Sequence, residues 1–583
     1  MKLITPKLFL LLSALFALIG AACGPAAGPT PINEAPAADR GVGQRGGSIT
    51  YRFSSPPRTY NYLLAEDEAS IILTFFLLND HLVSFDPLVQ EFRPEIAESW
   101  SLGDDGRTLA ITLREGVKFS DGRPVTSDDV IFTLESIYDK RTNSPAFRDA
   151  MLVSGKEIST RRIDDRRLEL IFPDDVANIQ GYLENLAILP RHALEKDAEA
   201  GRLAEAWKID SDPKSVVTSG PFVVESATPG ERVTLGRNPH YWRRDEAGTQ
   251  LPYLDQLVLE VIPDANAAFS RLSQGIDIID RIRSTDYAAL ASTEGPVRPY
   301  DAGPGLSSDH IWFNLNPGAG RDVKQAWFSD SRFRRAVSHA VDRVSIAANT
   351  LQGLASPQYG FVPAGNRAWL HPELPRVEYD LELARRLLAD AGFELKGEGD
   401  GAELFDAKGN RVEFSLIVPA ENEPRKMMAA VIQQDLARLG IAMAVTPIDF
   451  AGLTERWTKS YDYDAIMLGI GSTGVDPSAF ANFLLSSAAV HQWHPRQKTP
   501  ATEWEAEVDR LFNELSRTKD EAQRHELFNR IQEIMQRESP VIPVVSRHII
   551  SAGHERVGNL APSSIHPFSL WNAEELFIRP AGS

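Results

Sequence analysis

The chain is 583 residues long, with 43% hydrophobic residues, 24% charged residues and a formal net charge of −19. This length exceeds what one hydrophobic core usually holds, and the composition is that of a globular protein, which together predict two or more large lobes. The excess of acids, without a basic run, argues against a nucleic-acid partner. The single cysteine excludes an internal disulfide.

The N-terminus has the plan of a secretory signal. Basic residues precede an apolar run over residues 8–19, and small residues then lead to the only cysteine, Cys23. The run is shorter than the roughly 20 apolar residues of a membrane span, so residues 1–22 are predicted to be a cleaved signal peptide. The stretch before Cys23 resembles the lipobox of bacterial lipoproteins, although Gly20 stands where Leu is usual. The resemblance implies that Cys23 is lipidated; an ordinary signal peptide with an incidental cysteine is the alternative.

A flexible tether is predicted after this cysteine. Residues 23–46 are rich in Pro, Ala and Gly and lack a hydrophobic period. A segment of this composition behaves as a linker rather than as a folded element. We therefore expect the globular part to contact the membrane through the lipid anchor alone.

The first globular elements are predicted to be two strands and a capped helix. Apolar and polar side chains alternate over residues 46–55 and again over 109–113, which is typical of half-buried strands. Thr126, followed three residues later by Asp129, forms a capping box in which Asp takes the place of Glu. The pattern predicts that a helix begins at this point.

Helices and strands alternate in the second half of the chain. Pro424 begins a predicted helix that ends before Gly440, and an alternating strand follows. Residues 503–538 predict two helices, and residues 540–552 predict a strand. Helix, short loop and strand in succession indicate an α/β lobe.

The sequence holds no recognisable catalytic motif. It has none of H-E-x-x-H, G-x-S-x-G or G-x-x-x-x-G-K-[ST]. His491, Trp493 and His494 come nearest to a metal-ligand cluster, but no acid or thiol lies at a useful spacing. We therefore predict a protein that is not an enzyme and that uses neither metal nor cofactor. The distant alternative is a secreted, lipid-anchored hydrolase whose catalytic residues are scattered along the chain.

Five segments together resemble one protein family. They are AESWSLGDDGRTLAITLREGVKFSDGRPVTSDDVIFTLES (97–136), TSGPFVVESATPGERVTLGRNPHYW (218–242), SRFRRAVSHAVDR (331–343), EYDLELARRLLADAGF (378–393) and DYDAIMLGIGSTGVDP (462–477). They resemble, in this order, blocks of the extracellular solute-binding proteins of family 5. Those proteins are the dipeptide-, oligopeptide- and nickel-binding receptors of ABC importers.

This resemblance implies an α/β, bilobed periplasmic-binding-protein fold of type II, from the large cluster with an extra subdomain. A two-strand hinge, formed by residues 310–316 and 540–552, would join the lobes. The implied parts are lobe I (47–308, with an inserted subdomain at about 85–205), lobe II (309–548) and a return to lobe I (549–583).

The same resemblance implies a substrate-binding receptor that captures oligopeptides, or solutes of similar size, between its lobes. The receptor would deliver them to a membrane permease–ATPase complex. We expect it to be a monomer in the periplasm or on the outer face of the cell membrane. A receptor for oligosaccharides or glycosides is the alternative within the family, and the nickel branch is disfavoured because no chelator site is evident.

The resemblance also indicates where a ligand would bind. In peptide receptors of this family, an Asp in the loop after the DYDA strand holds the free amino group of the peptide. Alignment on Asp476 places Thr473 at that position, so either Asp476 replaces the missing acid or the ligand lacks a free amine.

Aromatic residues in segments that border the cleft of the family bear on the sugar alternative. Trp493, Trp369 and Tyr60 lie in such segments, and aromatic faces stack on sugar rings as well as on apolar side chains. The expected ligand-binding residues are Tyr60, Thr218, Ser219, Gly471, Ser472, Thr473, Asp476 and Trp493.

Overall fold

The computed structural model describes residues 41–319, 322–397, 399–472 and 474–580. The predicted signal peptide, Cys23 and most of the predicted tether lie outside the described residues, and so does Thr473. Within the described ranges, every helix is too short or too polar to cross a membrane.

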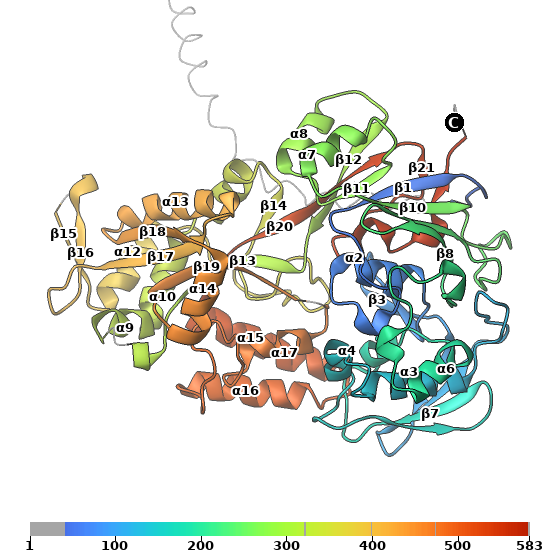
Figure 1. Ribbon diagram of the computed structural model, residues 1–583. Helices are drawn as coiled ribbons and strands as arrows, with labels where there is room; N and C mark the ends of the chain where they lie inside the picture. The colour runs from blue at the N-terminus through green and yellow to red at the C-terminus, as the bar shows by residue number, and fades with distance from the viewer. Residues whose placement is uncertain (1–40, 320–321, 398, 473, 581–583) are drawn as a thin grey trace, which may run out of the picture. The chain divides into compact units, whose positions relative to one another are not determined.

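The main sheet of the fold is mixed and has twelve strands (Figure 1). Its strands follow in the order β18 (Ala442–Ile448), β17 (Glu413–Pro419), β19 (Ala465–Gly471), β13 (Ser307–Phe313), β20 (Val541–His554), β11 (Ile278–Asp280), β1 (Ser48–Phe53), β10 (Gln256–Val261), β9 (Arg232–Arg237) and β8 (Phe222–Thr228). Two further strands, β12 (Val297–Pro304) and β14 (Ala355–Pro357), also pair with β20. The β1–β10 and β17–β18 pairs are parallel, whereas β13 is antiparallel to both of its neighbours.

The long strand β20 lies in the middle of this sheet and joins its two halves. Residues 541–545 of β20 pair with β13, and residues 550–554 pair with β11 and β12. The two strands predicted for the hinge are therefore neighbours, although β13 covers 307–313 instead of 310–316. Directly after β13, the side chain of Asn314 donates to the carbonyls of Tyr461 (2.8 Å) and Tyr463 (3.0 Å).

A second, four-stranded sheet occupies the part of the chain predicted as an inserted subdomain. Its order is β4 (Ala97–Leu102), β5 (Thr108–Leu113), β7 (Arg167–Ile171) and β6 (Ser159–Arg162). The hairpin and helices of the same region are β2 (Val83–Asp86), β3 (Glu91–Pro94), α3 (Ser127–Tyr138), α4 (Pro145–Ala150), α5 (Ile179–Glu184) and α6 (Arg191–Glu199).

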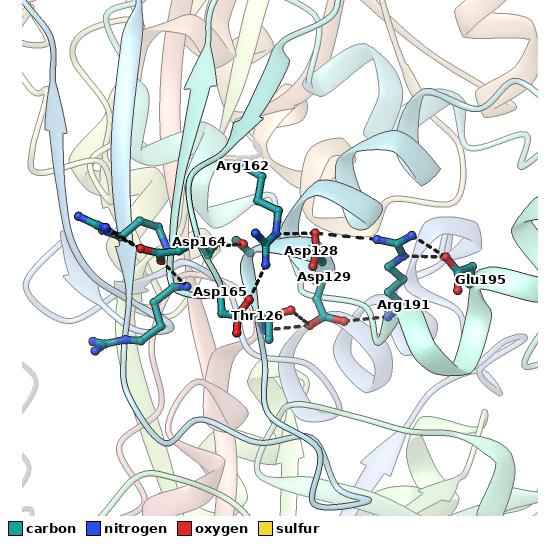
Figure 2. A network of polar contacts seen from close by, with 11 residues as sticks. Thr126, Asp128, Asp129, Arg162, Asp164, Asp165, Arg191 and Glu195 are labelled. Carbon is teal, nitrogen blue, oxygen red and sulfur yellow. Dashed lines mark hydrogen bonds and ion pairs between the residues drawn. The ribbon is translucent and has the colours of Figure 1, made fainter.

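The predicted capping box begins α3 and is part of a wider polar network (Figure 2). The backbone N–H and the hydroxyl of Thr126 donate to Asp129 Oδ2, at 2.8 and 2.9 Å. Asp129 Oδ1 accepts the backbone N–H of Arg191 (2.9 Å), and Arg162 Nε donates to Asp128 Oδ1 (3.0 Å). The network ties the start of α3 to β6 and to the start of α6. Its carboxylates therefore have partners within the fold.

The second half of the chain supplies most of the longer helices. They are α9 (Asp322–Ser329), α10 (Ser331–His339), α12 (Leu381–Asp390), α13 (Glu423–Ala437), α14 (Phe450–Glu455), α16 (Glu503–Leu515) and α17 (Glu521–Glu538). The two helices predicted over 503–538 are confirmed as α16 and α17. The prediction for α13 is also confirmed: Gly440 follows it with φ +73°, and a Cβ there would lie 2.7 Å from the backbone nitrogen of Leu404.

The remaining elements are short. They are α2 (Glu68–Ile71), α7 (Ala265–Arg271), α8 (Ser284–Ala291), α11 (Arg343–Ser345), α15 (Ala481–Leu484), β15 (Glu394–Lys396), β16 (Glu403–Phe405), β21 (Val557–Gly558) and β22 (Phe577–Ile578).

Apolar side chains are buried in separate clusters. One cluster draws on residues between 49 and 278 and on residues between 557 and 576, so the C-terminal segment packs with the first half of the chain. Two further clusters draw on residues between 311 and 545, together with Ile565. This distribution agrees with two lobes that are discontinuous in sequence. The boundaries at 308 and 548 remain predictions.

Candidate functional site

A cavity of about 2400 Å³ opens among the strands and loops of both halves of the chain. Its wall includes the segment after β1, the β2–β3 hairpin, the residues before β10, parts of β13 and β20, the loop after β19, and residues 559–575. Pockets for drug-sized molecules measure about 300–1,000 Å³, so this cavity has room for an extended ligand.

The structure brings only part of the predicted ligand-binding set to this cavity. Ser472 and Asp476 line it, whereas Tyr60, Thr218, Ser219, Gly471 and Trp493 lie outside its wall. Thr473 is outside the described residues.

Asp476 has partners within the protein. Arg524 donates from Nη2 to Asp476 Oδ2 (2.7 Å), and the backbone N–H of Ser478 donates to Asp476 Oδ1 (2.9 Å). The side chain of Arg524 is 7% exposed. The carboxylate therefore compensates a buried guanidinium, and a ligand ammonium would have to share it.

Thr218 and Ser219 support the backbone that borders the cavity. Thr218 Oγ1 donates to a backbone carbonyl four residues further on (3.0 Å), and Ser219 Oγ accepts the backbone N–H of Asp80 (3.0 Å). The next residue, Gly220, donates its N–H to the carbonyl of Leu78 (2.9 Å), and a Cβ at Gly220 would lie 2.7 Å from the carbonyl carbon of Leu78. Residues 218–220 thus hold residues 78–80 in place, and Asp80 lines the cavity.

Tyr60 and Trp493 are packed in the core, and each is 1% exposed. Trp493 Nε1 donates to Glu505 Oε1 (2.9 Å), and its ring lies against His491 and Trp504 at centroid distances of 4.0 and 5.6 Å. The faces of the Trp493 ring are therefore in contact with protein. In the described ranges, no group of three or more His, Cys, Asp or Glu side chains is placed to hold a metal ion.

An acidic cluster forms one part of the cavity wall. It is defined here as Asp80, Glu95, Glu184 and Glu574. Asp80, Glu95 and Glu574 interact with Arg243, and Glu184 interacts with Glu95 and His81. Arg243 donates from Nη1 to Glu574 Oε1 (2.5 Å), and its Nη2 lies 3.6 Å from Glu95 Oε1. Asp80 Oδ2 accepts from Trp242 Nε1 (2.6 Å). Distant segments of the chain bring these residues together, and no local sequence pattern marks them.

The electrostatics of the acidic cluster follow from burial. Burial, reinforced by the nearby Glu95 carboxylate, raises the pKa of Asp80 well above its ordinary value. Burial also raises the pKa of Glu574, and it raises the pKa of Glu184 to about 7. Loss of hydration of the charged form is the main cause of these rises, whereas His81 and Arg243 lower the pKa of Glu95.

Positive charge gathers on the cavity wall where β13 and β20 meet. Arg425 Nε donates to Asp309 Oδ1 (2.7 Å), and Arg547 Nε lies 3.0 Å from Asp309 Oδ2. The side chain of Asp309 is 2% exposed, whereas that of Arg547 is 39% exposed and lines the cavity. Two guanidinium groups thus share one carboxylate, which leaves this region positive. The cavity can therefore contact charged groups of either sign.

Sequence comparisons with known proteins agree with one another. Residues 91–492 match the family described as bacterial extracellular solute-binding proteins, family 5, middle region. The chain is 31% identical over 414 residues to a "Probable ABC transporter-binding protein" of Deinococcus radiodurans, with 67% of this chain and 68% of that relative covered. It is 25% identical over 524 residues to the "Oligopeptide-binding protein AppA" of Bacillus subtilis, with 88% of each chain covered.

Solved structures share the fold. The structure of AppA from Bacillus subtilis in complex with a nonapeptide matches with a TM-score of 0.64 at 24% identity, covering 92% of this chain and 100% of that one. The ABC transporter substrate-binding protein CtaP from Listeria monocytogenes matches with a TM-score of 0.73 at 22% identity, again covering 92% and 100%. These likenesses confirm the predicted α/β, bilobed periplasmic-binding-protein fold.

Proposed function

Because the chain belongs to the bacterial extracellular solute-binding proteins of family 5, we propose that it is the substrate-binding receptor of an ABC importer and that its ligands are oligopeptides. The family consists of binding proteins, not enzymes. The observation that carries the proposal is the cavity. Its volume of about 2400 Å³ suits a chain of several residues, and charged groups of both signs line it.

The charges of the wall favour a peptide over a sugar. At neutral pH a peptide carries an ammonium group, a carboxylate and a row of amides, which match the acidic cluster and the positive region around Arg547. Hydrogen bonds that involve an ionised partner are roughly twice as strong as neutral ones. An oligosaccharide offers only neutral hydroxyl groups, which form weaker hydrogen bonds with these charged groups than an ionised ligand group does. The sugar alternative also loses support because the ring of Trp493 is buried.

Capture would depend on movement about the paired strands β13 and β20. In the proposal, residues 47–308 and 549–583 form one lobe and residues 309–548 form the other. Enclosure of the ligand would bring both lobe surfaces into the arrangement that the permease–ATPase complex recognises.

Contacts across the proposed lobe boundary support such coupling. Gln90 Nε2 donates to the carbonyl of Gly365 (2.7 Å), and Gln90 Oε1 accepts the backbone N–H of Ala368 (3.0 Å). Between these two residues, Asn366 Nδ2 donates to the carbonyl of Val475 (2.8 Å), in the loop that lines the cavity. A shift of the cavity loop is therefore linked to the contact made by Gln90.

Export and anchoring complete the proposal. Residues 1–22 would be removed, Cys23 would carry the lipid, and residues 23–46 would tether the receptor. It would then act as a monomer in the periplasm or on the outer face of the cell membrane. This arrangement would keep the receptor near the permease.

Calorimetric titration tests the proposed function. The mature chain is titrated with a pool of free pentapeptides and, as a control, with maltopentaose. We expect saturable binding of one peptide per chain, recovery of the peptide intact, and no heat from the sugar. Binding of maltopentaose alone would contradict the peptide proposal, and cleavage of the peptides would identify a hydrolase instead.

A further inference from the structure

We infer that the acidic cluster receives a cationic group of the ligand, either an ammonium or a guanidinium. The inference rests on the proposed function, and it narrows the ligands to peptides that place a free N-terminal amine or a basic side chain at Asp80, Glu95, Glu184 and Glu574. The expected amine anchor thus lies in the first half of the chain and in the C-terminal segment, rather than in the loop that contains Asp476.

The balance of charge in the cluster is the first argument. Of the four carboxylates, Arg243 contacts those of Glu574 (2.5 Å) and Glu95 (3.6 Å) directly, and a second guanidinium, that of Arg114, lies over the ring of Trp242 (4.7 Å). Asp80 has a neutral donor, Trp242 Nε1, at 2.6 Å. Glu184 lies at the end of α5 and lines the cavity. A positive charge supplied by the ligand would stabilise the ionised form of these buried carboxyl groups.

Two buried acceptors beside the cluster are the second, independent argument. Asn79 is 2% exposed and His81 is 7% exposed, and both line the cavity. Asn79 Oδ1 and His81 Nε2 have no hydrogen-bond partner among the described residues. Buried polar atoms without a partner are rare in folded proteins and destabilise them, so each such atom needs an explanation.

The missing partner of both atoms is a donor. An amide oxygen such as Asn79 Oδ1 only accepts hydrogen bonds. His81 Nδ1 lies 3.6 Å from Glu95 Oε2, which favours the ring proton on Nδ1 and leaves Nε2 as an acceptor. An ammonium or guanidinium group has several N–H donors and a positive charge, so it satisfies these acceptors and the carboxylates together.

The surroundings strengthen such an interaction. The ring of Phe75 lies 4.2 Å from that of His81, measured between centroids, and both Phe75 and Phe76 line the cavity. Aromatic walls exclude water, which increases the attraction between charges, and their faces attract cations directly. The cluster therefore differs from a solvated patch of surface acids.

The test compares ligands that differ only in positive charge, using the full mature chain. The probes are penta-alanine, N-acetyl-penta-alanine, and an N-acetylated pentapeptide with one central lysine among alanines. We expect penta-alanine or the lysine peptide to bind about tenfold more tightly than N-acetyl-penta-alanine. Which of the two binds tightly identifies the source of the cation as the N-terminus or a side chain.

Variants test whether the tighter binding of the cationic peptide depends on the acidic cluster. Glu184→Gln should abolish it, and so should Asp80→Asn, which retains an acceptor for Trp242. The matched control is Glu66→Gln, because Glu66 is an exposed acid that lines the cavity outside the cluster. This control should keep the advantage. Equal binding of acetylated and free peptides by the wild type, or an advantage that survives in Glu184→Gln, would overturn the inference.

A non-peptide cation separates this inference from the proposed function. If no peptide binds but 1,5-diaminopentane binds to the wild type and not to Glu184→Gln, the cation site is supported and the peptide proposal fails. If peptides bind regardless of charge, the peptide proposal holds and the cation site fails. If neither the peptides nor the diamine bind, both fail.

Discussion

Arg524 Nη2 lies 2.7 Å from Asp476 Oδ2, so the only acid between residues 465 and 480 is paired with an arginine of α17. Their side chains are 7% and 15% exposed. The ion pair joins the cavity loop to a helix that begins 45 residues further along the chain, at Glu521, and gives Asp476 a structural role.

Replacement of Asp476 by Asn should therefore affect stability more than binding. Asn can still accept the N–H of Ser478, but the buried guanidinium of Arg524 would lose its counter-charge. Loss of one partner of a buried ion pair costs about 3–5 kcal/mol in the free energy of unfolding. Urea unfolding of the wild type and of Asp476→Asn measures this cost.

The double variant Asp476→Asn/Arg524→Gln is the control, and it should recover part of the lost stability because no unpaired charge remains. The affinity of Asp476→Asn for penta-alanine should stay within about threefold of the wild type. If Asp476→Asn bound penta-alanine much more weakly but was as stable as the wild type, Asp476 would be the group that binds the peptide amine.

His310 should make stability depend on pH. It lies on β13, and burial lowers its pKa to about 4. An unfolded histidine titrates near pH 6.5, so below that pH the unfolded state takes up the proton first. The folded state is therefore favoured above pH 7 and loses stability as the pH falls from about 6.5 towards 4.

Urea unfolding at pH 7.5 and pH 4.5 measures this effect. The wild type should lose about 2 kcal/mol more than His310→Gln over this interval. The exposed residue His240 supplies the control, since His240→Gln should behave as the wild type. Equal losses in all three proteins would show that folding does not lower the pKa of His310.

Binding of a cationic peptide should release protons near pH 7. Burial, opposed by His81 and assisted by Glu95, raises the pKa of Glu184 to about 7. A bound cation lowers the pKa of a nearby carboxyl group, so a half-protonated Glu184 would lose its proton. Calorimetry with penta-alanine in phosphate and in Tris counts the protons, because the two buffers differ in ionisation enthalpy.

The released fraction should approach half a proton per peptide from this group at pH 7, and should fall in Glu184→Gln. Heats that do not depend on the buffer would contradict a role for Glu184 in cation binding.

Cys23 should attach the receptor to lipid. The wild type expressed in bacteria with its signal should enter the detergent phase of a two-phase separation, because an acyl group adds a large apolar surface. Cys23→Ser should enter the aqueous phase. A wild type found in the aqueous phase would show that Cys23 carries no lipid.

Local patterns predicted the elements of this fold because short-range physical chemistry determines them. Thr126 and Asp129 form the capping box within four residues of sequence, and Gly440 is required by the backbone conformation after α13. The family resemblance supplied the arrangement of these elements, which no single pattern contains.

The cavity could not be predicted in the same way. Trp493 is an aromatic residue in a segment expected to border the cleft. Its ring is nevertheless buried, because it packs against His491 and Trp504. The partner of Asp476 lies 48 residues away, and the acidic cluster joins residues from Asp80 to Glu574. Such contacts depend on how the chain folds, so the spacing of these residues in the sequence does not predict them.

Native mass spectrometry of the Cys23→Ser protein, purified from bacterial periplasm without detergent, tests the central claim most directly. The mature chain is sprayed without denaturation, and any bound molecule is released and sequenced in the same instrument. We predict a mixture of short peptides, one per chain, most of them with a free amine or a basic residue. A homogeneous oligosaccharide or another uncharged solute in their place would contradict the assignment as a peptide receptor.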